Sequence, residues 1–277
     1  MRFTYANWKN FCKTLFQNGI QSKTAADVLN KKNGEKYLVL KHDVETNVKK
    51  AFKISQIETA YGHKASYYVQ AYLINNKKNV SMLKKMSENG HEISYHYDVM
   101  DSNKGDIKKA MAEFNKNKVL FEQNGFNLFT VCQHGNPLVN RVGYSSNRDF
   151  FRNSAVKKTY PQIADIMVDF KEKANTDYLY FSDAGRKFKL IFDPINNDII
   201  PSDDKNIDFE SFNEIFKCIE VNNCIISTHP HRWERFGSIC EIKSVSFKII
   251  KKIAKYAFQV PFLQKIMSRY YYLSKKI

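Results

Sequence analysis

Leu38-Val39-Leu40-Lys41-His42-Asp43-Val44-Glu45 begins as an apolar run and ends in side chains capable of acid–base or metal-binding chemistry. An aliphatic run that leads into polar residues is typical of a buried strand in a parallel sheet. Residues two apart on a strand point to the same face, so we expect Asp43 and Glu45 to share one face. One carboxylate can then bind a metal while the other accepts a proton from bound water. Alternatively, the Asp43 and Glu45 pair is a solvated strand end, or an N-cap for a helix that begins near Thr46.

The same order of apolar run, polar residues and helical pattern recurs along the chain. The further apolar runs are 65–69, 92–95, 129–132, 163–168 and 224–226. Apolar residues at helical spacing predict helices near 48–61, 82–86 and 107–119. Alternating strands and helices imply a parallel sheet with helical crossovers, so we expect an α/β fold. The number of units suggests a barrel, an open doubly wound sheet fits the same pattern, and the apolar stripes are interpreted as core.

Length, net charge and cysteine content limit which classes of protein this chain can belong to. The 277 residues suffice for one sizeable core, and no apolar run reaches the length of a membrane span. The net charge of +16 comes mostly from lysine, without a helix-turn-helix, zinc-finger or RNA-recognition pattern, so we expect no nucleic-acid partner. Five scattered cysteines and a start without an apolar signal core favour reduced thiols and a cytoplasmic location.

Residues with metal-binding or acid–base chemistry follow four of the apolar runs. These sets are Lys41-His42-Asp43-Val44-Glu45, Tyr95-His96-Tyr97-Asp98, Gln133-His134-Gly135-Asn136-Pro137 and Ser227-Thr228-His229-Pro230-His231-Arg232-Trp233. The carboxyl ends of parallel strands meet at one edge of a sheet, where α/β enzymes build their sites. Carboxylates and neutral imidazoles bind Zn²⁺, and a catalytic zinc uses three protein ligands plus an open position. The sequence therefore predicts one shared site for a divalent metal.

Several of these segments together resemble the polysaccharide deacetylase superfamily, which is carbohydrate esterase family 4-like and NodB-like. The main ones are 38–45, Gly90-His91-Glu92-Ile93-Ser94-Tyr95-His96-Tyr97 and Thr228-His229-Pro230. The segments 132–138, 180–186 and 229–233 fit a branch associated with O-antigen and capsule biosynthesis. The resemblance covers roughly 36–236. It implies a deacetylase-type distorted barrel in 1–240, and 241–277 then form a C-terminal helical tail that is basic and amphipathic.

The resemblance also implies an activity and roles for four residues. The activity is metal-dependent hydrolysis of a carbohydrate amide, the removal of an N-acetyl group from a sugar, with Zn²⁺ as the expected cofactor. Asp43 is the base, and Glu45 stands where the family has a metal-binding Asp. His96 matches the first metal histidine, and His229 matches the histidine that protonates the leaving amine.

The sequence departs from the family pattern at the second metal histidine. That residue lies four positions after the first, and here the position is Met100, a poor ligand for such an ion. We expect His134 to replace it, with Asp98 or His42 as lesser candidates. An alternative assignment makes Asp43 the metal ligand and puts His42 in the base position. The departure also leaves open a non-catalytic, sugar-binding relative, and the His/Asp cluster leaves open another metal hydrolase such as a phosphoesterase.

The resemblance and the composition also suggest substrate contacts and a function for the C-terminal tail. The residues expected at the substrate are His42, Tyr97, Asp98, Arg186, His231 and Trp233. After Glu241 the chain has many lysines and no acidic residue, with apolar residues at helical spacing both before and after Pro261. Such a helix suits peripheral contact with an anionic inner-membrane face. The alternative is a helix that docks on the barrel with its lysines in water.

Overall fold

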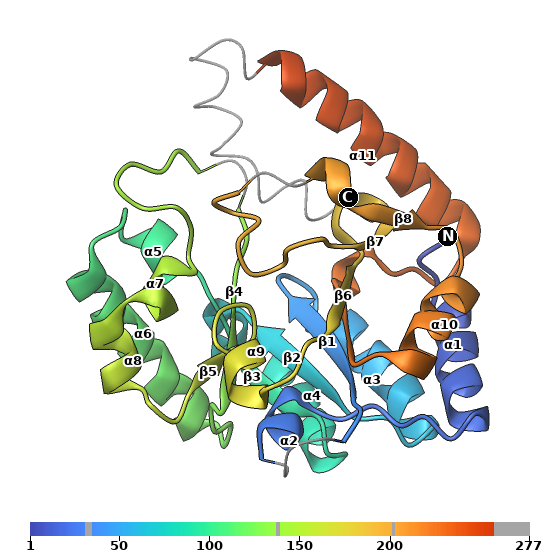
Figure 1. Cartoon of the computed structure of the whole chain (residues 1–277), viewed down its shortest axis with the longest axis horizontal. Helices are drawn as coiled ribbons and strands as arrows, with labels where there is room; N and C mark the ends of the chain where they lie inside the picture. Colours follow the sequence, from blue (N-terminus) through green and yellow to red (C-terminus); the bar gives the residue numbers. More distant parts are fainter. Residues whose placement is uncertain (31–34, 137–138, 201–202, 258–277) are drawn as a thin grey trace.

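The computed structural model describes residues 1–30, 35–136, 139–200 and 203–257. They form a mixed α/β structure around one nine-stranded sheet, with the order β5-β4-β3-β2-β1-β9-β6-β7-β8 (Figure 1). The strands are β1 (Leu38–Val44), β2 (Ala65–Val69), β3 (Glu92–Tyr97), β4 (Thr130–Gln133), β5 (Ala164–Asp165), β6 (Leu179–Ser182), β7 (Phe188–Leu190), β8 (Ile207–Phe209) and β9 (Cys224–Thr228).

The sheet is parallel from β5 to β6, while β7 and β8 add an antiparallel edge. The predicted α/β fold with a parallel-rich sheet is therefore confirmed. A closed barrel is not, because no pairing among the described strands joins β5 to β8.

Helices cover the sheet and connect its parallel strands. They are α1 (Tyr5–Gln17), α2 (Ala25–Leu29), α3 (Val48–Ala60), α4 (Lys77–Glu88), α5 (Val99–Ser102), α6 (Ile107–Gln123), α7 (Asp149–Arg152), α8 (Ser154–Thr159), α9 (Phe170–Ala174), α10 (Phe212–Val221) and α11 (Gly237–Ala257), with 3₁₀ turns η1 (Ala71–Asn75), η2 (Ala184–Arg186), η3 (Asp203–Lys205) and η4 (Pro230–Arg232). The Asn47 side chain caps α3, and Gly62, at φ +73°, follows its end.

Two apolar clusters lie on opposite faces of the sheet. The outer cluster joins Leu40 and Tyr67 to side chains of α1, α3, α4 and α6. The inner cluster joins Val39, Tyr68 and Ile225 to α2 and α9. Every residue of β1 is buried, as expected of a central parallel strand covered on both faces. Because side chains alternate along β1, its residues divide between the two clusters.

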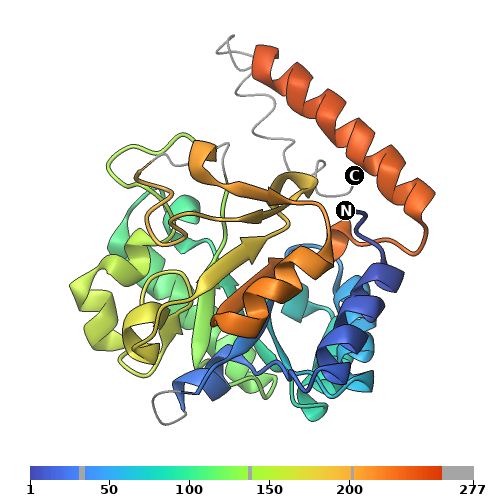
Figure 2. The same ribbon diagram turned by 45° about the vertical axis from the view of Figure 1, so that its right-hand side comes forward.

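The strand register brings the polar strand ends to one edge. His42 of β1 pairs with Thr228 of β9, and Tyr97 of β3 pairs with Gln133 of β4. The helix α11 runs along the outside of the molecule in both views (Figures 1 and 2). It begins at Gly237, inside the range expected for the catalytic domain. Within the described residues, no helix combines the length and apolar character that crossing a membrane requires.

Candidate metal centre and acid–base pairs

Glu45, His96 and His134 form a compact, buried group at the ends of β1, β3 and β4. One ligand atom from each lies within 4.8 Å of the others. Glu45 Oε1 is 3.2 Å from His134 Nδ1 and 4.0 Å from His96 Nε2. Two imidazole nitrogens and one carboxylate oxygen are the donor set of many catalytic zinc sites. The structure thus brings together the three residues expected from the sequence to bind the metal.

The state of His96 fits a metal ligand. Its Nδ1 lies 3.1 Å from the carbonyl oxygen of Cys132, so an Nδ1–H can donate there and leave the Nε2 lone pair toward Glu45. Nε2 is buried and makes no hydrogen bond to the described residues. Burial lowers the pKa of His96 to about 3, although Asp43 acts to raise it. The imidazole is therefore neutral, the form that binds a metal.

A second ligand group, Asp43, His96 and Cys132, shares His96 with the first. Both Asp43 oxygens accept hydrogen bonds from Lys41 Nζ, at 2.7 and 2.6 Å. A cation would have to compete with this buried ammonium. Burial also raises the pKa of the Cys132 thiol well above its ordinary value, which keeps the sulfur protonated. The Glu45 group is therefore the better metal site.

Asp43 is held ionised at the centre of the cluster. Burial acts to raise its pKa, but Lys41, His96 and His229 outweigh burial and lower it. One Asp43 oxygen is 4.0 Å from His96 Nδ1, and the other is 3.8 Å from His229 Nε2. Asp43 therefore lies between the metal group and the last histidine of the site.

His229 is fixed by Asp183, which directly follows β6. Its Nδ1 lies 2.5 Å from Asp183 Oδ1, and its backbone N–H donates to Oδ2 at 2.9 Å. The fully buried carboxylate also accepts from Arg232 and from the indole of Trp233. Burial acts to raise the pKa of Asp183, but His229 and Arg232 lower it far below its ordinary value. The ionised Asp183 thus orients His229 with Nε2 toward Asp43.

Three expected substrate contacts are corrected, because the side chains lie in the protein interior. His42 is fully buried, with Nε2 2.8 Å from Glu58 and Nδ1 2.6 Å from Thr228. Because His42 faces α3, the alternative assignments of His42 as the base or as a metal ligand are also wrong. Tyr97 is buried and donates to Asp165 at 2.6 Å. Trp233 is fully buried in aromatic packing.

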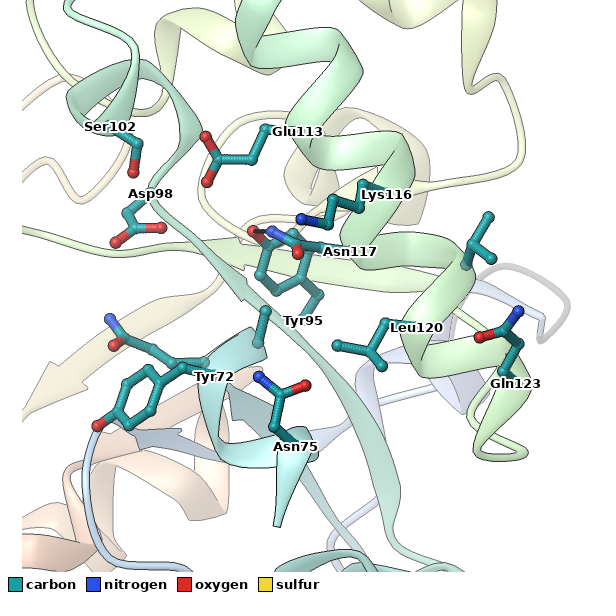
Figure 3. A pocket seen from close by; sticks show the side chains of 13 residues that line it. Tyr72, Asn75, Tyr95, Asp98, Ser102, Glu113, Lys116, Asn117, Leu120 and Gln123 are labelled. Carbon is teal, nitrogen blue, oxygen red and sulfur yellow. Dashed lines mark hydrogen bonds between the residues drawn. The ribbon is translucent and has the colours of Figure 1, made fainter.

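The remaining expected residues lie nearer to the site. His231 is half-buried, with its ring centroid 5.9 Å from that of His229. Arg186 is half-buried in the turn after β6, at φ +60°, with its guanidinium 5.7 Å from the ring centroid of Phe247. Asp98 lines a cavity between η1 and α6 (Figure 3). Met100 is buried in the outer core, consistent with His134 taking the position of a ligand in its place.

Lys41 and Asp183 are functional residues for which no individual role was expected from the sequence. Lys41 could have been found from the period of two, because Lys41, Asp43 and Glu45 alternate along one strand face. Asp183 stands at the end of an apolar run, as the other site residues do. Its partnership with His229 depends on the pairing of β6 with β9, which local sequence does not reveal.

Comparisons with known proteins give distant structural similarities. No family model and no curated protein matches the chain. The catalytic domain of a peptidoglycan N-acetylglucosamine deacetylase from Eubacterium rectale is 12% identical, covers 80% of this chain and 87% of its own, and has a TM-score of 0.43. A CE4 esterase from Streptococcus mutans is 15% identical over 85% of this chain and 89% of its own, with a TM-score of 0.43. The peptidoglycan deacetylase PdaC from Bacillus subtilis is 12% identical over 83% and 100%, with a TM-score of 0.33. With TM-scores below 0.5, these similarities do not by themselves assign a family or an activity.

Proposed function

We propose that this chain is a metal-dependent hydrolase that removes an N-acetyl group from a sugar during surface-polysaccharide biosynthesis. The proposal rests on one observation: Glu45, His96 and His134 lie close together, beside Asp43 and His229. Asp43, His96 and His229 match roles that the deacetylase resemblance implies, while Glu45 and His134 take the places of the family's Asp and second histidine. Zn²⁺ is the proposed ion, because two imidazoles and a carboxylate are borderline ligands that suit it.

In the proposed mechanism, five side chains have a direct role. Glu45, His96 and His134 would hold the ion, which when bound would lower the pKa of water toward ~7 and polarise the acetyl carbonyl. Asp43 accepts the proton of the attacking water. His229 delivers a proton from Nε2 to the departing amine.

Two supporting residues keep these proton-transfer groups in place. Lys41 holds both oxygens of Asp43 and compensates its buried charge. Asp183 holds His229 Nδ1 and stabilises the imidazolium that donates the proton. Because Asp43 Oδ2 and His229 Nε2 are 3.8 Å apart, one can face the attacking water and the other the departing nitrogen of the same amide.

The arrangement supports a deacetylase better than a phosphoesterase. Phosphoesterases often use two metal ions 3.5–4 Å apart as a clamp on the reacting oxygens. The two ligand groups among the described residues share His96, so they provide for one ion at a time. One of the carboxylates, Asp43, is already occupied by Lys41.

Acetate release from N-acetylglucosamine and its β-1,4-linked oligomers tests the proposal. Wild-type protein loaded with Zn²⁺ should release acetate, and Asp43→Asn and His229→Ala should each lose activity by about 10²–10⁴-fold. Asp208→Asn is the control, because its carboxylate pairs with Lys187 and Lys189 near the surface of the antiparallel edge. Metal-loaded protein without acetate release from any of these sugars would contradict the hydrolase.

We further propose that the C-terminal tail makes peripheral contact with an anionic membrane. On α11, Ile242, Val245 and Ile249 are exposed by 67%, 55% and 55%, and their spacing of three and four residues places them on one helix face. The helix lies outside the sheet and its covering helices (Figure 2). The lysine-rich sequence provides the charge that attracts anionic lipids. The tail residues 258–277 lie outside the described residues.

A further inference from the structure

The helix α11 contacts the rest of the chain along one face, its inward face, which consists of Cys240, Lys243 and Phe247. Cys240 is 3% exposed and belongs to the outer apolar cluster. Lys243 Nζ lies 2.9 Å from Glu234 Oε1, and the centroid of the Phe247 ring lies 5.7 Å from the Arg186 guanidinium. The spacing of three and four residues places these contacts on one side of the helix. The exposed apolar residues at 242, 245 and 249 each come two positions later, which is about 200° around the helix.

The contact at Glu234 leads to η4, the turn that follows His229. Glu234 Oε1 lies 2.9 Å from Lys243 Nζ and 2.7 Å from Nζ of Lys50, which belongs to α3. The same Lys50 ammonium donates to the backbone oxygen of His231, within η4, at 2.9 Å. Burial acts to raise the pKa of Glu234, but its hydrogen bonds to the two lysines lower it. An ionised carboxylate between two ammonium groups therefore joins α11 to η4.

The contact at Arg186 leads to η2, the turn that follows Asp183. Arg186 is the last residue of η2, and its backbone N–H donates to the backbone oxygen of Asp183 at 3.1 Å. At φ +60° the Arg186 backbone is left-handed, a conformation that is strained for a residue with a side chain. Such strain persists only where the surrounding structure holds it. The Phe247 ring, which lies within cation–π distance of the guanidinium, is one such contact.

The two turns that α11 contacts carry the acid pair, Asp183 and His229. Asp183 directly precedes η2, and His229 directly precedes η4. Arg232, in η4, donates to the backbone oxygen and to Oδ1 of Asp183 at 2.8 and 3.0 Å. The short contact between His229 Nδ1 and Asp183 Oδ1 therefore depends on how η2 and η4 lie relative to each other. The metal-binding group belongs to other elements, the ends of β1, β3 and β4.

We infer that Lys243 and Phe247 are positioning residues for the proton donor, because α11 holds η2 and η4 so that His229 stays paired with Asp183. The catalytic unit then extends beyond residue 240 and includes α11. The role of His229 as the proton donor rests on the proposed function.

The test removes both contacts at once in the double variant Lys243→Met/Phe247→Ala. The conservative variant Lys243→Arg/Phe247→Tyr keeps a cation and an aromatic ring at the two positions. The control is Ile239→Ala/Glu241→Gln on the same helix, since Ile239 is 38% exposed and Glu241 forms an exposed ion pair with Arg2. All proteins are full-length and loaded with Zn²⁺. Elemental analysis should give about one equivalent of the ion in each, which shows that the metal group is intact.

Two measurements then report on the acid pair. Long-range proton–nitrogen NMR spectra give the chemical shifts of both ring nitrogens of each histidine, and His229→Ala assigns the signals of His229. The wild type, the control and the conservative variant should share one set of His229 shifts, while Lys243→Met/Phe247→Ala should move the Nδ1 signal because its hydrogen bond to Asp183 weakens. In acetate release, the same variant should lower kcat about tenfold with less than about twofold change in KM.

Two results would overturn the inference: His229 signals in Lys243→Met/Phe247→Ala that match the control, or, in active protein, an unchanged kcat. Acetate release by the wild type would then show that the proposed hydrolysis stands without a contribution from α11. A shifted Nδ1 signal in the variant, without acetate release by the wild type, would instead support the positioning role and contradict the hydrolysis.

Discussion

Replacing Lys41 by methionine should strongly destabilise the fold, because it leaves the charge of Asp43 buried without a partner. The two side chains are 1% and 9% exposed, and Lys41 Nζ lies 2.7 and 2.6 Å from the carboxylate oxygens. At about 3 Å and an effective dielectric constant of about 20, the Coulomb attraction is about 5 kcal/mol. Removal of one partner from a buried pair typically costs about 3–5 kcal/mol. We expect Lys41→Met to lower the free energy of unfolding by about that amount.

The assay is guanidinium unfolding of metal-free protein at pH 7, followed by circular dichroism. Lys109→Met is the matched control: its partner Asp106 is 3.2 Å away, the two side chains are 73% and 42% exposed, and such a surface pair contributes about 0–1 kcal/mol. The double variant Lys41→Met/Asp43→Asn should regain most of the lost stability, because it removes the stranded charge. A loss no greater than the control's, or a double variant no more stable than Lys41→Met, would refute the reasoning.

Three further predictions concern the acid, a buried carboxyl and the tail. Asp183→Asn should lower kcat for acetate release by about 10²–10³-fold, with a smaller effect on KM. The reason is that His229 loses the charge that stabilises its protonated form. An unchanged kcat would exclude this role of Asp183. Burial raises the pKa of Asp165 to about 6, above its unfolded value of about 4, so its contribution to stability is fully present below pH 4 and falls as pH rises through 6. Asp165→Asn should remove up to about 3 kcal/mol of that decline in unfolding measured from pH 4 to 7, and matching pH profiles for the two proteins would contradict it. Truncation after Cys240 should abolish co-sedimentation with anionic vesicles, and unchanged co-sedimentation would end the membrane proposal.

Local sequence predicted much of the parallel sheet because its strands and the helices between them have strong local signals. Apolar runs predicted β1 and β2, and the helical period from Ile107 predicted α6. The gathering of Glu45, His96 and His134 followed from one rule, that the ends of parallel strands share an edge. Whether the sheet closes depends on pairing between its two ends, for which no single segment carries a signal.

The errors at the site have identifiable causes. His42 and Tyr97 were expected at the substrate because they stand within polar sets. Alternation along the strand already places each on the face opposite to its neighbour in the site, Asp43 or His96. Trp233 is different, because its ring packs 5.0 Å from Trp8, a contact between the two ends of the chain that only the folded structure reveals.

The cavity that Asp98 lines could not be predicted from the sequence either. Its walls combine η1 with α6, which are separated by α4 and β3 along the chain. Polar residues on a helix such as Asn117 have the pattern of an ordinary solvated face.

Metal content measured by elemental analysis tests the central claim most directly. The comparison includes the wild type, His96→Ala, His134→Ala and Cys132→Ser, since the cysteine belongs only to the alternative ligand group. We predict about one equivalent of Zn²⁺ in the wild type and in Cys132→Ser, and loss of the ion in both histidine variants. Wild-type protein without metal after reconstitution, or His134→Ala that keeps a full equivalent, would contradict the account.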